Sequence, residues 1–96
     1  MSIKSSIESK LTEKLSPIFL KVENESHLHS VPKGSESHFR IEIVSNLFEE
    51  KGLLLRHRLI NEIISEEISK IRACSLHTMT ELEWEKKNGK TENSPT

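Results

Sequence analysis

The sequence predicts a single α+β domain in which helices cover one face of a small mixed sheet. Two apolar periodicities support this. Apolar residues recur every fourth position over residues 3–15, which is typical of an amphipathic helix. Further along, apolar and polar residues alternate, as they do along a half-buried strand. The 96 residues suffice for one domain, and a hydrophobic fraction of 33% argues against wholesale disorder.

The first half of the chain is expected to form a helix followed by two strands. The helix over residues 3–15 must stop at Pro17, and Ser16 is expected to be extended because it precedes a proline. A strand begins at Ile18, with alternate apolar side chains on one face. Residues 27–37 form a polar connection, and a second alternating segment follows over 38–43. These two strands are expected to pair as an antiparallel hairpin with a long connection.

The second half is expected to add a helix, a strand and a short final helix. A connector over residues 46–52 precedes a helix that begins near Leu53 or Leu54 and ends near Ser69. Residues 71–78 are a short mixed segment, interpreted as a third strand. Thr80 and Glu83 have the spacing of a capping box, and this box opens a helix on which Trp84 is expected to face the sheet. The domain is expected to span residues 1–87, followed by a disordered polar tail over 88–96.

Composition limits the function. The formal net charge of −1 argues against avid, nonspecific nucleic-acid binding, although a local basic face remains open for the middle of the chain. Cys74 is the only cysteine, which fits a reducing compartment. The N-terminus lacks an apolar signal core, and no segment approaches the roughly 18 apolar residues of a membrane helix. We therefore expect a cytoplasmic protein that is a monomer or a weak homodimer on its own.

Three histidines gather around one turn. His27, His29 and His38 flank the segment Pro32-Lys33-Gly34. Such a connection could present imidazoles to a metal or polar groups to a partner. For His29 the residues leave two interpretations open, a metal ligand and a surface imidazole that stabilises a turn. No convincing catalytic pair or glycine-rich phosphate loop is found, so we do not expect an enzyme.

Several motifs resemble the BolA family in order and spacing, over roughly residues 3 to 84. They are Glu25-Ser26-His27, His29-Ser30-Val31-Pro32, Gly34-Ser35-Glu36-Ser37-His38-Phe39, Arg56-His57-Arg58-Leu59, and Leu76-His77-Thr78 followed by Trp84. The resemblance implies a KH-like (class II) αββαβ two-layer domain with a short C-terminal helix.

The resemblance also implies two functions. The first is a non-catalytic adaptor that pairs with a monothiol glutaredoxin of the CGFS type, with or without a bridging 2Fe–2S cluster, in iron–sulfur trafficking and iron regulation. The residues expected to bind this partner are His27, His29, Lys33 and His38. The alternative is a DNA-binding transcriptional regulator of stress response and cell morphology. It would use a helix-turn-helix-like segment with Lys51, Arg56 and Arg58.

The ligand pattern of the family is incomplete in this chain. The resemblance implies one cluster ligand in the connection, matched by His29, and a histidine at the start of the last strand, where this chain has Arg72. A guanidinium has no free lone pair for iron. Three hypotheses remain: Cys74, on the same side of the strand, is a substitute ligand; the complex forms without a cluster; or the nucleic-acid role dominates. Cys74 equally fits a small buried hydrophobe.

Overall fold

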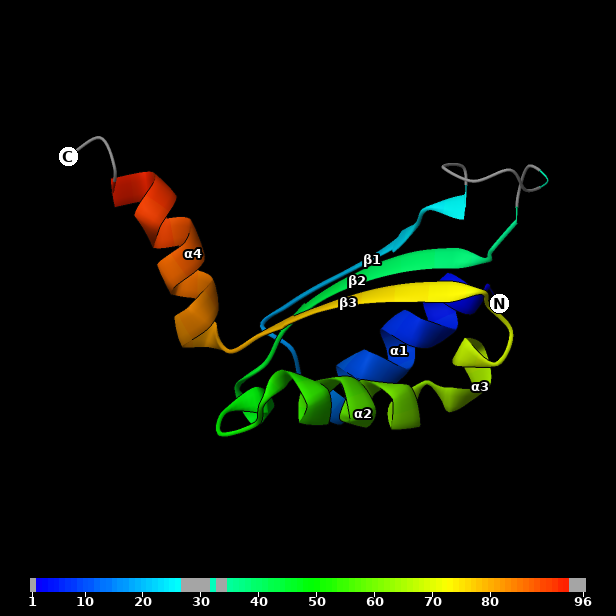
Figure 1. Ribbon diagram of the computed structural model, residues 1–96, viewed down its shortest axis with the longest axis horizontal. Coiled ribbons are helices and arrows are strands. Elements are labelled where there is room, and N and C mark those ends of the chain that lie inside the picture. Colours follow the sequence, from blue (N-terminus) through cyan, green and yellow to red (C-terminus); the bar gives the residue numbers. More distant parts are fainter. Residues whose placement is uncertain (1, 27–31, 33–34, 94–96) are drawn as a thin grey trace.

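The computed structural model describes residues 2–26, 32 and 35–93. Figure 1 shows the three strands as one layer, with α1, α2 and α3 beneath it and α4 extending away from one end of the sheet. The two-layer α+β arrangement expected from the sequence is therefore confirmed. In chain order the elements are α1 (Ile3–Leu15), β1 (Phe19–Asn24), β2 (His38–Val44), the 3-10 helix η2 (Asn46–Phe48), α2 (Leu53–Ile63), α3 (Ser65–Ile68), β3 (Ala73–Met79) and α4 (Glu81–Asn93).

The sheet is mixed, with the strand order β1-β2-β3. β1 and β2 are antiparallel, with Lys21 opposite Glu42, which confirms the predicted hairpin. β2 and β3 are parallel, with Glu42 opposite His77, so the chain must cross over through α2 and α3. This topology leaves β1 and β3 as the two edge strands among the described residues.

The core lies between the sheet and the helices. α1 buries Ile7, Leu11 and Leu15 along the predicted apolar stripe. The strands contribute every second residue to this core, and residues of η2 and α2 complete it. The opposite face of the sheet is polar in its middle, where Arg40 pairs with Glu23 and Glu42. The core residues from the remaining elements are Val22, Phe39, Ile41, Ile43, Phe48, Ile60 and Ile64.

Three local expectations differ from the structure. Ser16 is left-handed (φ 42°, ψ 56°) rather than extended, because it caps α1 by donating its N–H to the Thr12 carbonyl. Ile18 is 47% exposed and lies just before β1. The helix expected to run from Leu53 to Ser69 is broken at Ile64 (φ −108°, ψ 31°). The break turns α3 toward α1, where Glu67 meets Lys10 at 3.0 Å.

The final helix starts as expected and continues further than expected. Thr80 donates its N–H to Glu83 Oε1 (2.9 Å), and the Glu83 N–H donates to Thr80 Oγ1 (3.2 Å), which confirms the capping box. α4 then runs to Asn93, and the expected disorder of the tail over 88–96 stays a prediction. The domain boundary at residue 87 stays a prediction.

The Trp84 ring stacks on Phe19 at a centroid distance of 5.4 Å, so the expected contact of this helix with the sheet is confirmed. Within the described part of the chain, no helix is long and apolar enough to cross a membrane.

Candidate functional site

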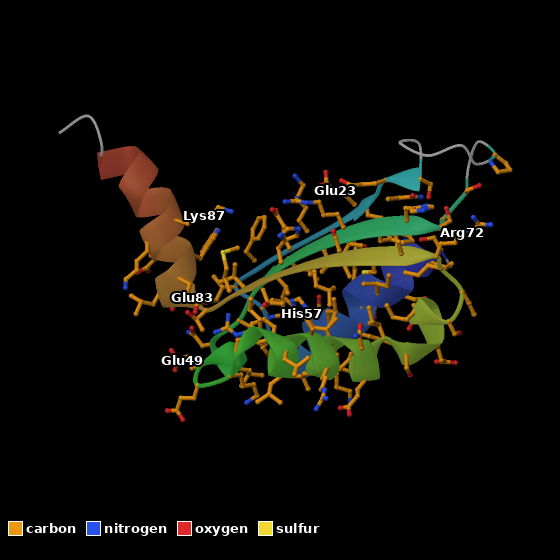
Figure 2. The ribbon with its side chains drawn as sticks, viewed as in Figure 1. Glu23, Glu49, His57, Arg72, Glu83 and Lys87 are labelled. Carbon is orange, nitrogen blue, oxygen red and sulfur yellow. The ribbon has the colours of Figure 1, made fainter. Side chains whose placement is uncertain are left out.

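The ends of the long connection after β1 converge on the start of β3. The Arg72 N–H donates to the Ser37 carbonyl (2.8 Å), and the Ala73 N–H reaches the same oxygen (3.2 Å). Ser26 Oγ accepts from the N–H groups of Ser37 (2.9 Å) and His38 (3.2 Å). Arg72 therefore lies at the end of the sheet where the connection joins β2 (Figure 2).

The histidines of the site are only partly described. His27, His29 and Lys33 lie outside the described residues, so their assignment to partner or metal binding stays a prediction. His38 is the first residue of β2 and is half-buried, with its Nδ1 2.8 Å from Ser37 Oγ. That contact orients the imidazole beside the connection. Its expected role in partner binding also stays a prediction.

Cys74 lies on the helix-facing side of β3. Its side chain is half-buried against the core, and burial raises the pKa of the thiol to about 11. It shares a hollow of about 170 Å³ with Arg72, which fits the predicted common side of the strand. A metal ligand must be the thiolate, which burial disfavours when no metal ion is bound. No group of three or more His, Cys, Asp or Glu side chains suited to a metal occurs among the residues described.

Arg56 does not lie where a phosphate contact would require it. It is 6% exposed, and its guanidinium donates to both carboxylate oxygens of Glu83, at 2.7 and 3.1 Å. Its Nε donates to the Lys51 carbonyl (2.8 Å), and its Nη1 reaches the Thr78 carbonyl (3.3 Å). The Arg56 side chain thus joins three elements inside the protein, and its expected nucleic-acid role stays a prediction.

The two other predicted nucleic-acid residues are accessible but do not form a basic patch. Arg58 is exposed on α2, and Lys51 is half-buried just before it. Exposed Glu49 and Glu50 directly precede Lys51 and offset its charge. Phosphate binding depends on a net positive local field. The roles of Lys51 and Arg58 stay predictions.

Sequence reasoning missed two features of this region. The pairing of Glu83 with Arg56 joins residues 27 positions apart, and no local pattern signals it. His57 lies between α2 and β3 (Figure 2), and its Nε2 is buried without a hydrogen-bond partner within the described residues. In Arg56-His57-Arg58, the first two side chains point into the protein and only Arg58 is exposed.

A mixed three-stranded sheet with helices on one face, and a long connection between its first two strands, defines a KH-like class II domain. The chain belongs to the BolA family. The family model described as BolA-like protein matches residues 11–83.

Relatives and solved structures cover most of the chain. The DNA-binding transcriptional regulator BolA of Vibrio cholerae is 44% identical over 97% of this chain and 89% of its own. A BolA-like protein of Dictyostelium discoideum is 47% identical over 90% of this chain and 77% of its own. The solution structure of BolA1 from Mus musculus superposes with a TM-score of 0.83 at 39% identity, over 92% of this chain and 72% of that one.

Proposed function

We propose that this protein is a non-catalytic adaptor that binds a monothiol glutaredoxin of the CGFS type, in iron–sulfur trafficking and iron regulation. One observation carries the proposal. The bond from the Arg72 N–H to the Ser37 carbonyl brings the start of β3 against the end of the connection that holds His29. The family resemblance implies one cluster ligand from each of these two segments, and the glutaredoxin shares that cluster. In this chain Ser37 and Arg72 lie next to each other at that end of the sheet.

The described residues do not fit a bridging 2Fe–2S cluster held in the family manner. Arg72 cannot donate a lone pair to iron, and Cys74 faces the helices with a pKa raised by burial to about 11. We therefore favour a complex that forms through protein contacts, without a requirement for the cluster. In that complex His38 and the connection supply polar contacts beside Arg72.

An iron-free binding experiment tests this proposal. The protein is titrated with a CGFS glutaredoxin in the presence of a chelator and followed by calorimetry and native mass spectrometry. A one-to-one heterodimer without iron is expected. His29→Ala should weaken it, whereas Lys51→Glu, on the other side of the fold, should not. Absence of a heterodimer with and without iron and sulfide would contradict the adaptor role.

A second candidate is a DNA-binding transcriptional regulator, because the Vibrio cholerae relative carries that name. Lys51 and Arg58 are the accessible cations of the helix-turn-helix-like segment, while Arg56 is engaged internally. Fluorescence anisotropy with duplex DNA at several salt concentrations distinguishes the two functions. Affinity that falls steeply with salt and is weakened by Arg58→Glu would favour the regulator. No DNA binding at low salt would exclude it.

A further inference from the structure

The outer edge of β3 carries backbone groups that the sheet does not use. The Ala73 N–H donates to the Ser37 carbonyl, and the Met79 carbonyl accepts from the Ser45 N–H. These two bonds, one at each end of β3, show which residues of the strand direct their backbone N–H and C=O groups toward β2. The odd-numbered residues bond to β2, so the backbone groups of Cys74, Leu76 and Thr78 point away from it.

Among the described residues, only at the α4 end of this edge is an outward backbone group already hydrogen-bonded. Arg56 Nη1 donates to the Thr78 carbonyl at 3.3 Å, which occupies the acceptor nearest α4. Within the described residues, no hydrogen bond reaches the outward N–H and C=O groups of Cys74 or Leu76. An unpaired edge of this kind is a template on which another extended segment can add as a strand.

Two hollows lie along the same edge, between β3 and the helices. The first, of about 170 Å³, is formed at Arg72 and Cys74 with Asn61 and Ile68 from the helices. The second, of about 240 Å³, continues at Leu76 and Thr78 and is bounded by Leu53 and His57 of α2. Together they follow β3 over nearly its whole length. They offer space for alternate side chains of an added strand.

The chemistry of the lining indicates the occupant. The described residues that line the two hollows include one arginine, one lysine and two histidines but no carboxylate, in a chain whose 15 acidic residues outnumber its 14 Lys and Arg. Apolar side chains such as Leu53, Ile71 and Leu76 make up most of the remainder. No Phe, Tyr or Trp is among the described residues that line either hollow, so these residues offer no stacking platform of the kind used by single-stranded nucleic acid. The basic residues are His57, Arg72, His77 and Lys87.

We propose that the outer edge of β3 binds an extended, acidic polypeptide segment as a fourth strand of the sheet. Its backbone would pair with Cys74 and Leu76. The side chains on one of its faces would enter the two hollows, where carboxylates would lie near Arg72. This inference does not depend on the glutaredoxin proposal, because a probe peptide can test it alone, although the two surfaces share Arg72 at the start of β3.

The test uses the isotope-labelled full chain and a blocked peptide in which glutamate and valine alternate. Binding is followed by amide chemical shifts and by hydrogen exchange. We expect the amides of Cys74 and Leu76 to shift and to exchange more slowly when the peptide is bound. Arg72→Glu should weaken binding about threefold to tenfold. Lys14→Glu, a charge reversal on exposed α1, should leave the affinity unchanged.

Two matched peptides separate backbone pairing from simple charge attraction. A peptide methylated on the amide nitrogens that would face β3 should not bind, since it cannot form the ladder. A peptide with lysine in place of glutamate should bind much more weakly. Equal affinity of the methylated peptide would overturn the proposal. Binding of oligothymidylate at this edge in place of the peptide would also overturn it. The same holds if the slow exchange at Cys74 and Leu76 depends only on the concentration of the protein, because the edge would then bind a second copy of the chain.

Discussion

Arg56 and Glu83 form a bidentate ion pair that joins α2 to the first turn of α4, with N–O distances of 2.7 and 3.1 Å. The Arg56 side chain is only 7% exposed, whereas that of Glu83 is 48% exposed. The same guanidinium lies 5.7 Å from the centroid of the Phe48 ring. A single buried cation thus connects η2, the end of β3 and α4. Figure 2 shows Glu83 at the base of α4.

Removal of the Arg56 side chain should destabilise the fold markedly. In Arg56→Ala the carbonyls of Lys51 and Thr78 and the Glu83 carboxylate lose their donor, for an expected loss of about 2–3 kcal/mol. Urea unfolding measures this loss. Arg56→Lys should recover little, because an ammonium cannot make the two-pronged contact. Arg58→Ala, at an exposed position, should change the stability by less than about 0.5 kcal/mol. Equal effects at positions 56 and 58 would contradict the internal role.

Acid should weaken this connection. The hydrogen bond from Arg56, and then that from the Thr80 N–H, lower the pKa of Glu83 below its ordinary value of 4.5. A carboxylate with a depressed folded-state pKa stabilises the protein fully above its unfolded pKa. That contribution is lost as the pH falls from about 4.5 through the lower folded value. Urea midpoints measured across this range should therefore fall more steeply for the wild type than for Glu83→Gln. If the urea midpoints of the two proteins fall in parallel with pH, the ionisation of Glu83 does not contribute to stability.

The stack of Phe19 on Trp84 should contribute to the attachment of α4. Phe19 is paired with Val44, which is fully buried although it lies on the open face of the sheet. Aromatic pairs contribute about 0.5–1.5 kcal/mol beyond their buried area. A double-mutant cycle with Phe19→Leu and Trp84→Leu should return a coupling energy in that range. Additive effects within about 0.3 kcal/mol would mean that the rings do not stabilise one another.

The order and type of the elements follow from local signals in this chain. The four-residue spacing from Ile3 to Leu15 sets α1, and alternation sets β1 and β2. The capping box at Thr80 is a contact between residues three positions apart, so sequence spacing alone predicts it. The break at Ile64 could not be predicted in this way, because no glycine or proline marks it and α3 contacts α1, a helix distant in the sequence.

The candidate site was less predictable than the fold. Position 72 was recognised from the family pattern, but its contact with Ser37 depends on the parallel pairing of β2 and β3. A charged side chain such as that of Arg56 is expected at the surface. Its burial is possible because the guanidinium pairs with Glu83, a residue distant in the sequence. The free edge of β3 has no sequence signature, since backbone groups are the same in every residue.

The buried Cys74 thiol should react slowly in the folded protein. Its pKa of about 11 leaves little thiolate at neutral pH, and half of the side chain is covered. Alkylation by iodoacetamide should be much slower than in the urea-unfolded chain, and its rate should rise with pH until about 11. Mass spectrometry of timed samples measures both rates. Fast labelling at neutral pH, with a plateau near pH 8, would instead identify an activated cysteine.

Restoring an imidazole at position 72 should create a cluster-binding partner for a glutaredoxin. The Arg72 side chain is exposed, and its backbone bond to Ser37 does not involve the guanidinium, so Arg72→His should leave the fold intact. Neutral imidazole provides the lone pair that arginine lacks. Anaerobic reconstitution with a CGFS glutaredoxin, iron and sulfide should give stronger visible circular dichroism for Arg72→His than for the wild type. Arg72→Gln, which removes the charge without adding an imidazole, should show no gain. If Arg72→His and Arg72→Gln behave alike, the residue at position 72 does not limit cluster binding.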